Sequence, residues 1–297
     1  MKDSIEEFIR QGRAEGRKDK TLKSHRDRLE HLLRFLGDRR PADVKPVDLE
    51  GYLADLREQG WKRSGRRSIC STIRAFFDWL AERGKVISNP ARNLRVERND
   101  EEELPPPPLS VEEVGQILDG LPRRNVLDLR NRSLLELLYG CGLRLAEAIA
   151  LDLRDADMPN RALHVHGKGG KDRDLPLGRG AINAIRDYLA LRRSLLKGPD
   201  HGALLLDSRG RRMREIHAWG WFKRLNKARG PRARHLHPHL FRHSIAVHLL
   251  QGGADVRHVQ QFLGHEKLDT TKIYLRLVPG RLKEDYEKAM PVIPILE

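Results

Sequence analysis

The feature that most constrains this chain of 297 residues is a break about one third of the way along it. Residues 99–104 contain a run of acidic side chains, and four consecutive prolines occupy positions 105–108. Four prolines in a row fit neither a helix interior nor a central strand, and they favour extended polyproline geometry. The sequence therefore predicts a domain at 1–98, a semi-rigid linker at 99–108 and a second domain at 109–297.

Apolar residues in the first domain recur with the period of a helix. Three stripes stand out: Leu29, Leu32, Leu33 and Leu36; Val47, Leu49, Leu53 and Leu56; and Ile69, Ile73, Phe76, Phe77 and Leu80. Together with a short segment around Ile5 to Ile9, they predict a bundle of four or five helices. Its many exposed arginines are compatible with contact to a DNA groove, and equally with an ordinary solvated surface.

The second domain mixes helices with a little β-structure. Ser110 has the position of an N-cap, and Glu113 completes a capping box with it. Residues 162–166 and 173–177 alternate like short strands, and the glycine-rich turn 167–171 predicts that they form a hairpin. Helical patterns cover 132–151, interrupted by Gly140 and Gly142, and then 181–196, 219–227, 239–250 and 256–263. The predicted fold class is mainly α with a small antiparallel β-sheet.

Charge and cysteine content narrow the class of protein. The formal net charge is +15 with an isoelectric point near 10.1, so a polyanionic partner such as nucleic acid is expected. Two cysteines, Cys70 and Cys141, form neither a disulfide framework nor a metal-ligand spacing, which suits a reducing cytosol. The N-terminal residues have no apolar signal-peptide core, and no apolar run approaches the ~20 residues of a membrane span. A cytoplasmic protein is therefore expected.

Residues suited to acting on a phosphate group occur in five separated places. They are Arg144 with Glu147, Lys168 in the glycine-rich turn, His239 with Arg242, His265 after Gly264, and Tyr274. Each of the two pairs has a spacing of three, which brings both side chains to one face of a helix. The sequence predicts that Arg144 lies within such a helix and that His265 follows the end of one.

These residue types fit phosphoryl transfer without a metal ion. Two arginine forks hold the charge that develops on non-bridging oxygens. A phenol ionises near pH ~10, so Tyr274 needs positive surroundings or a nearby base. Lys168 can protonate the leaving alkoxide, and His239 or His265 can exchange protons near neutral pH. The sequence has no obvious carboxylate cluster for two-metal catalysis, and neither a metal ion nor an organic cofactor is expected.

In this order, the segments resemble the tyrosine recombinases, or phage-type integrases, and most closely their Xer-like branch. The resemblance rests on Gly142-Leu143-Arg144 with Glu147, on Gly167-Lys168-Gly169-Gly170-Lys171, on residues 238–244, and on Leu263-Gly264-His265 followed nine positions later by Tyr274. It extends over nearly the whole chain, because residues 1–98 resemble the helical core-binding (SAM-like) domain of that family. It implies a two-domain, C-shaped clamp on DNA with the catalytic domain at 109–297.

The resemblance also implies a mechanism. Tyr274 is the nucleophile that forms a 3′-phosphotyrosyl bond, Arg144 and Arg242 hold the scissile phosphate, and Lys168 is the general acid. His239 assists proton transfer and His265 hydrogen-bonds the phosphate, whereas Glu147 orients Arg144. The six implied catalytic residues are Arg144, Lys168, His239, Arg242, His265 and Tyr274.

The same resemblance implies the partners. It indicates double-stranded DNA with an inverted-repeat site, brought together by a homo-tetramer or by a hetero-tetramer with a paralogue, on the nucleoid. It leaves open control by a DNA translocase, and also the choice between resolving chromosome or plasmid dimers and integrating or excising a mobile element.

Several alternatives remain open at this level. A type IB topoisomerase uses a similar set of residues, and a DNA-binding protein could keep the fold without the chemistry. Lys171 is a rival to Lys168 as the acid. The histidines between 235 and 248 have the spacing of a zinc site, but no cysteine or acidic ligand lies near them, which favours ordinary hydrogen-bonded histidines.

Overall fold

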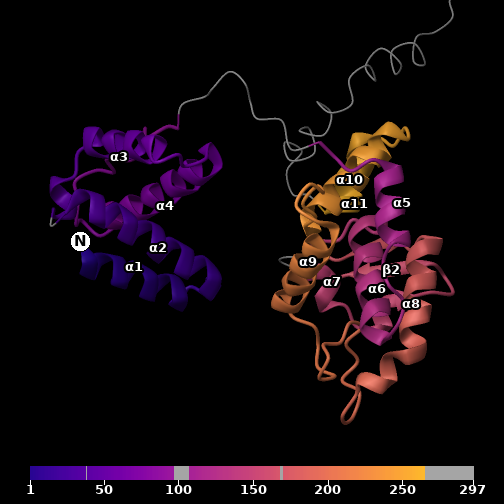
Figure 1. Cartoon of the computed structure of the whole chain (residues 1–297). Coiled ribbons are helices and arrows are strands. Elements are labelled where there is room, and N and C mark those ends of the chain that lie inside the picture. Colours follow the sequence, from indigo (N-terminus) through magenta and orange to yellow (C-terminus); the bar gives the residue numbers. More distant parts are fainter. Residues whose placement is uncertain (38, 97–106, 168–169, 265–297) are drawn as a thin grey trace, which may run out of the picture. The chain divides into compact units, whose positions relative to one another are not determined.

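The computed structural model describes residues 1–37, 39–96, 107–167 and 170–264. The chain separates into two compact units, unit 1 (Met1–Glu102) and unit 2 (Glu103–Glu297) (Figure 1). Most of the described residues are helical, and the strands are confined to unit 2. The predicted fold class, mainly α with a small antiparallel sheet, is therefore confirmed.

In its described residues, unit 1 is a bundle of four α-helices. They are α1 (Lys2–Ala14), α2 (Asp19–Leu36), α3 (Pro46–Glu58) and α4 (Arg63–Glu82), with a short 3-10 turn at Pro41–Asp43. The leucines of α2 and α3 and the aromatic stripe of α4 pack into one hydrophobic core, as the periodicity predicted. Val47 is an exception, because it is 65% exposed. It lies two residues before Leu49, about 200° away around the helix, and so belongs to the opposite face.

Unit 2 contains seven α-helices and three strands in its described part. The helices are α5 (Val111–Asp119), α6 (Val126–Gly140), α7 (Leu145–Ala150), α8 (Arg179–Arg192), α9 (Glu215–Arg229), α10 (Pro238–Gln251) and α11 (Val256–Leu263). Short 3-10 turns lie at Leu153–Asp155 and Arg193–Leu195. Helix α5 begins at the predicted capping box, where the Ser110 hydroxyl accepts from the Glu113 amide and the Glu113 carboxylate accepts from the Ser110 amide.

The helix expected over 132–151 is in fact two helices. Helix α6 ends at Gly140, and α7 begins only at Leu145. Between them Gly142 has φ +58°, and a Cβ atom there would lie 2.8 Å from the ring of Phe262. Positive φ and the close approach of α11 together require glycine at this break. The break also determines the placement of Arg144, which lies between the two helices.

The sheet has three antiparallel strands in the order β1 (Ala156–Asp157), β2 (Ala162–Val165) and β3 (Arg173–Pro176). The hairpin β2–β3 confirms the two predicted strands, with Leu163 opposite Leu175 and Val165 opposite Arg173. Strand β1 was not predicted, because two residues are too few to show an alternating pattern. Leu163, Val165 and Leu175 are buried, so this side of the hairpin faces the core and the other side faces solvent.

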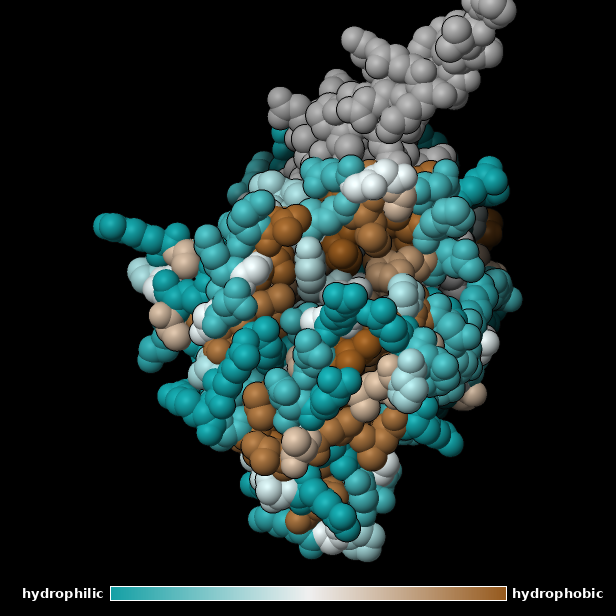
Figure 2. All heavy atoms as spheres, turned by 90° about the vertical axis from the view of Figure 1, so that its right-hand side faces the viewer, coloured by the Kyte–Doolittle hydropathy of each residue, from teal (hydrophilic) through white to brown (hydrophobic). Residues whose placement is uncertain are grey.

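Helix α6 is the centre of unit 2 and packs most extensively against α8 and then α10 (Figure 1). One hydrophobic core joins α5 to α10 with the sheet, and a small cluster between α10 and α11 extends it. On the face shown in Figure 2, hydrophilic side chains predominate, and hydrophobic ones are visible between them in separate strips. No helix within the described residues is long and apolar enough to span a membrane.

Candidate active site

Arg144 precedes α7 instead of lying within it. Its backbone is extended, with φ −69° and ψ 149°, and it is the N-cap residue of the helix. The Arg144 amide donates to Glu147 Oε2 at 2.9 Å, and Nη1 of the side chain donates to Glu147 Oε1 at 2.7 Å. The prediction that Arg144 is helical is therefore wrong, because Gly142 ends the preceding helical segment. The prediction that Glu147 reaches Arg144 is confirmed.

Arg242 and His239 both come from the first turns of α10. Arg242 is almost fully buried, and its guanidinium donates to the carbonyls of Gly142 and Leu263. Its Nη1 lies 3.7 Å from Glu147 Oε2. The structure thus brings Arg144 and Arg242, which are 98 positions apart in the sequence, to one carboxylate.

A third arginine, which the sequence analysis missed, completes the cluster. Arg173 of β3 lies 2.9 Å from Glu147 Oε2 through Nη2 and 3.3 Å from Oε1 through Nη1. Its side chain is only 11% exposed. A signal was present in the sequence: strand alternation puts Arg173 on the same side of β3 as the buried Leu175. A charge on a buried face requires a partner, and Glu147 provides it.

The same three arginines hold the C-terminal end of α11. Arg173 Nε donates to the carbonyl of Phe262 at 3.2 Å, Arg242 donates to that of Leu263, and Arg144 Nη2 donates to that of Gly264 at 3.0 Å. Carbonyls at a helix C-terminus lack partners within the helix and carry partial negative charge. Three guanidinium groups therefore satisfy this end of α11, directly before position 265.

Gly264 allows this close approach. It is the C-cap of α11 in the left-handed conformation, with φ 61° and ψ 49°. A Cβ atom at this position would lie 2.9 Å from Nη1 of Arg173. The Gly264 of the sequence motif thus has a physical role, because another side chain would be strained and would press on the arginine cluster.

The electrostatics of the cluster favour binding an anion. Burial acts to raise the pKa of the Glu147 carboxyl, but hydrogen bonds from Arg173 and Arg144 outweigh it and hold the pKa below its usual value. Glu147 is therefore ionised at neutral pH, and one negative charge faces three positive ones. Because Arg144 keeps a side-chain exposure of 40%, the excess positive charge is accessible from solvent. A phosphodiester has the charge and the oxygen atoms to use it.

His239 lies at the surface at the start of α10, near the same arginines. Desolvation of its ring, followed by the positive charges of Arg242 and Arg144, lowers its pKa. The neutral imidazole is thereby favoured near neutral pH, so His239 can accept a proton there.

Three predicted site residues, Lys168, His265 and Tyr274, lie outside the described residues. The alternative acid, Lys171, is exposed at the start of the segment that leads into β3. Their predicted roles therefore remain predictions.

The histidines of α10 do not form a metal site with one another. His243 is buried. His248 uses both ring nitrogens within unit 2, one with the Tyr139 hydroxyl at 2.9 Å and the other with the carbonyl of Leu109 at 2.8 Å. His248 thereby ties α10 to α6 and to the start of α5, which is a structural role.

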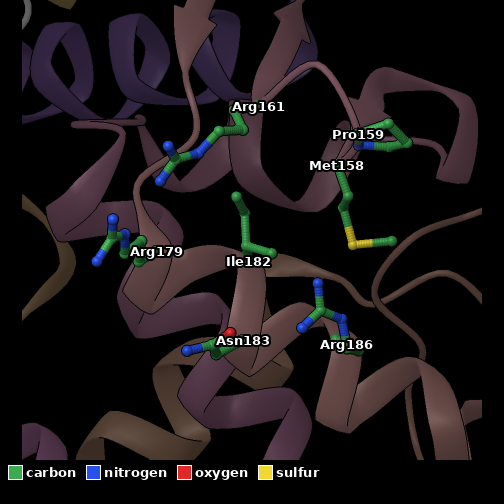
Figure 3. A pocket seen from close by; sticks show the side chains of 7 residues that line it. All are labelled: Met158, Pro159, Arg161, Arg179, Ile182, Asn183 and Arg186. Atoms are coloured by element: carbon green, nitrogen blue, oxygen red, sulfur yellow. The ribbon is translucent and has the colours of Figure 1, made fainter.

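A separate hollow of about 310 Å³ lies beside the first turns of α8 (Figure 3). It is lined by Met158, Pro159, Arg161, Arg179, Ile182, Asn183 and Arg186. Three of these residues are arginines and none is acidic, so the hollow presents positive charge to solvent. It shares no residue with the cluster around Glu147.

Comparison with known proteins shows the family of this chain. The phage integrase family matches residues 108–280, and the N-terminal SAM-like domain of phage integrases matches residues 5–84. Tyrosine recombinase XerC of Alcanivorax borkumensis is 39% identical over 84% of this chain and 81% of the relative. Tyrosine recombinase XerC of Chromobacterium violaceum is 35% identical over 98% of this chain and 95% of the relative.

Solved structures show the same fold. The XerA recombinase is 24% identical, with a TM-score of 0.53 over 98% of this chain and 99% of that chain. An integrase of the Tn1549 transposon, in complex with transposon right end DNA, has a TM-score of 0.77 at 19% identity over 97% and 99% of the two chains. A lambda integrase dimer bound to a COC′ core site has a TM-score of 0.72 at 18% identity over 92% and 94%.

The chain belongs to the phage integrase family. Its similarity to XerC proteins over most of its length places it among the Xer-like tyrosine recombinases, as the sequence motifs predicted.

Proposed function

We propose that this protein is a site-specific recombinase that cuts and rejoins double-stranded DNA through a 3′-phosphotyrosyl bond to Tyr274. The observation that carries the proposal is the cluster of Arg144, Arg173 and Arg242 around Glu147, with excess positive charge open to solvent at Arg144. Such a cluster suits the non-bridging oxygens of a scissile phosphate, whose charge grows in the transition state. Membership of the phage integrase family supports the same reaction.

Each predicted residue has a distinct task in this proposal. Arg144, the most exposed guanidinium of the cluster, binds the phosphate directly. The buried Arg242 helps to hold the phosphate in position. His239, neutral near pH 7, exchanges the proton of the reacting oxygens. Lys168 protonates the 5′-oxygen as it leaves, and His265 donates a hydrogen bond to the phosphate. The energy of the broken bond is kept in the phosphotyrosine, so the exchange consumes no ATP.

The substrate and the assembly follow from the same proposal. Residues 1–98 and 109–297 act as DNA-binding and catalytic domains on an inverted-repeat site, joined by the linker 99–108. Four copies, or two of this chain with two of a paralogue, bring two sites together in the cytoplasm on the nucleoid. A DNA translocase is a candidate regulator. Resolution of chromosome or plasmid dimers is the first role to test, and integration or excision of a mobile element is the second.

The test is to trap covalent protein–DNA adducts and sequence the attached DNA. Cells express the intact protein, a Tyr274→Phe variant and a matched Tyr286→Phe control. The proposal expects adducts from the intact protein and the control, concentrated at one inverted-repeat site, and none from Tyr274→Phe. A nicked suicide substrate built on that site then accumulates the intermediate in vitro.

Other outcomes support the two rival functions. Adducts that depend on Tyr274 but are scattered over the genome indicate a topoisomerase that relaxes supercoils. If neither the cells nor suicide substrates yield adducts, and Tyr274→Phe keeps the biological function, the protein is a DNA-binding member of the family without catalysis.

A further inference from the structure

Two histidines and two aspartates face each other on the solvent side of the β2–β3 hairpin. His164 is paired with Asp174 across the strands, while His166 and Asp172 lie just beyond the last pair, Val165 with Arg173. Because side chains alternate along a strand, these four lie on the side opposite to the buried Leu163, Val165 and Leu175.

Three ligand-type atoms of this group converge. Asp172 Oδ2 lies 2.9 Å from Nδ1 of His166 and 3.5 Å from Nε2 of His164. The two imidazole rings are 4.8 Å apart between centroids and nearly perpendicular, at 79°. Ligand atoms of a tetrahedral zinc ion, each about 2.0–2.2 Å from the metal, are about 3.3 Å from one another. The ligand-type atoms of the three residues all lie within 4.8 Å of one another, so the two histidine nitrogens would approach each other by at most about 1.5 Å to coordinate one ion with Asp172.

The remaining nitrogen of each imidazole faces a second carboxylate. Nδ1 of His164 lies 2.8 Å from Oδ1 of Asp174. Nε2 of His166 lies 3.7 Å from Oδ1 of Asp155, whose other oxygen accepts from the amide of Asp152 at 2.7 Å. Metal-binding histidines commonly donate their second N–H to a carboxylate, which orients the ring and directs the other nitrogen's lone pair at the metal. Ordinary surface ion pairs between histidine and aspartate do not require a second carboxylate beside each imidazole ring.

We propose that His164, His166 and Asp172 form a binding site for a divalent transition-metal ion of the Zn²⁺ class, oriented by Asp174 and Asp155. Two imidazoles with one carboxylate select such an ion over Mg²⁺ or Ca²⁺, which prefer oxygen ligands. Three protein ligands leave a fourth position for water. Side-chain exposures of 45%, 54% and 40% for His164, His166 and Asp172 leave the site open to an ion from solution.

The ion would link the two strands at the turn end of the hairpin. His166 precedes the turn 167–171 and Asp172 follows it, so one metal would join the two strand ends on either side of that turn. Without an ion, the 2.9 Å contact of His166 Nδ1 with Asp172 Oδ2 and the 3.3 Å hydrogen bond from the Gly167 amide to Asp172 link the two sides of the turn. Arg173 lies between Asp172 and Asp174 but points to the other side of β3, toward Glu147. The metal site and the arginine cluster therefore occupy opposite sides of one strand.

The experiment uses the full chain without a histidine tag, freed of metal with a chelator that is then removed. Zn²⁺ is titrated by calorimetry, and Co²⁺ is titrated while its visible absorption is followed. We expect one ion per chain. His164→Ala or His166→Ala should weaken binding at least 100-fold, and Asp174→Asn about 10- to 100-fold, because it removes only the orienting carboxylate. The matched control, His235→Ala with His237→Ala, should bind normally.

Folding is checked separately. Each variant is compared with the parent by far-UV circular dichroism and by its thermal midpoint without metal. Zn²⁺ should raise the midpoint of the parent but not that of His164→Ala, since an ion that binds only the folded state stabilises it. If an alanine variant is unfolded, Asp172→Asn removes the carboxylate ligand at nearly constant shape and replaces it in the series.

The proposal is overturned if the parent binds no Zn²⁺ or Co²⁺, or if the hairpin variants bind as well as the parent. It is also overturned if only the His235 and His237 variant loses binding, which would put the ion on the other histidine stretch. None of these measurements contains DNA, so they do not depend on the proposed recombination.

Discussion

Among the described residues, Glu147 is the carboxylate that pairs with all three arginines, so Glu147→Gln tests whether this cluster holds unit 2 together. The substitution keeps the size of the side chain and one acceptor oxygen. It removes the ion pairs with Arg173 and Arg242, which are 11% and 4% exposed, and leaves those guanidinium groups facing an amide. The pair with Arg144 is more exposed and is screened by solvent, so it adds little.

The expected loss is large because one partner of a buried charge network is removed. Breaking such a pair costs about 3 kcal/mol at the lower end of measured values. For a unit of this size each kcal/mol lowers the melting temperature by about 2–4 °C, which gives about 6–12 °C in all. The pKa of Glu147 is lowered in the folded state, so its stabilisation is fully present above its usual pKa of 4.5 and is lost as pH falls through the folded value. The difference between parent and variant should therefore shrink in acid.

Differential scanning calorimetry at pH 7 and at pH 4 measures both effects. Glu136→Gln is the matched control, since Glu136 is another buried glutamate of unit 2. Burial raises the pKa of Glu136, so its charged form is unfavourable in the fold, and its replacement should leave the melting temperature unchanged or raise it at neutral pH. A shift below 2 °C for Glu147→Gln at pH 7, or an equal shift for Glu136→Gln, would refute the reasoning.

Three further predictions concern the same unit. Gly264→Ala should lower the folding stability by about 1–2 kcal/mol, since φ is +61° and the new methyl would press on Arg173. Thermal melts measure this loss, and Gly115→Ala is the control because a Cβ atom at that position meets no atom within 4 Å. Cleavage of a suicide substrate should persist below the usual histidine pKa of 6.5 and then fall as His239 is protonated, and an unchanged acidic limb in His239→Gln would contradict this. Burial raises the pKa of Cys141 to about 12, so a thiol reagent should label it only in unfolded protein, and fast labelling of the native chain would disprove this.

The sequence was a good guide wherever one periodic signal ran over several turns. The aromatic stripe of α4 and the leucines of α2 and α3 are buried as expected, and His239 and Arg242 share α10. These cases depend only on spacing along one helix.

Predictions failed where the answer depended on an interaction distant in the sequence. The interruption at Gly140 and Gly142 was predicted, but the next helix begins only at Leu145, which places Arg144 at an N-cap position. Arg173 was missed because its partner Glu147 belongs to another element 26 positions away. The pairing of His164 and His166 with Asp172 likewise appears only once the hairpin register is known.

Under the proposed function, the carbonyls of Phe262, Leu263 and Gly264 have a consequence for how readily the site receives a phosphate. Three like charges repel one another, and in a flexible site the incoming phosphate would have to gather them and displace their water. Here the end of α11 and Glu147 already hold the three guanidinium groups together before any ligand arrives. The site is therefore preorganised, because the unfavourable gathering of three positive charges takes place during folding. An incoming phosphate then requires little rearrangement of the charges and dipoles around it.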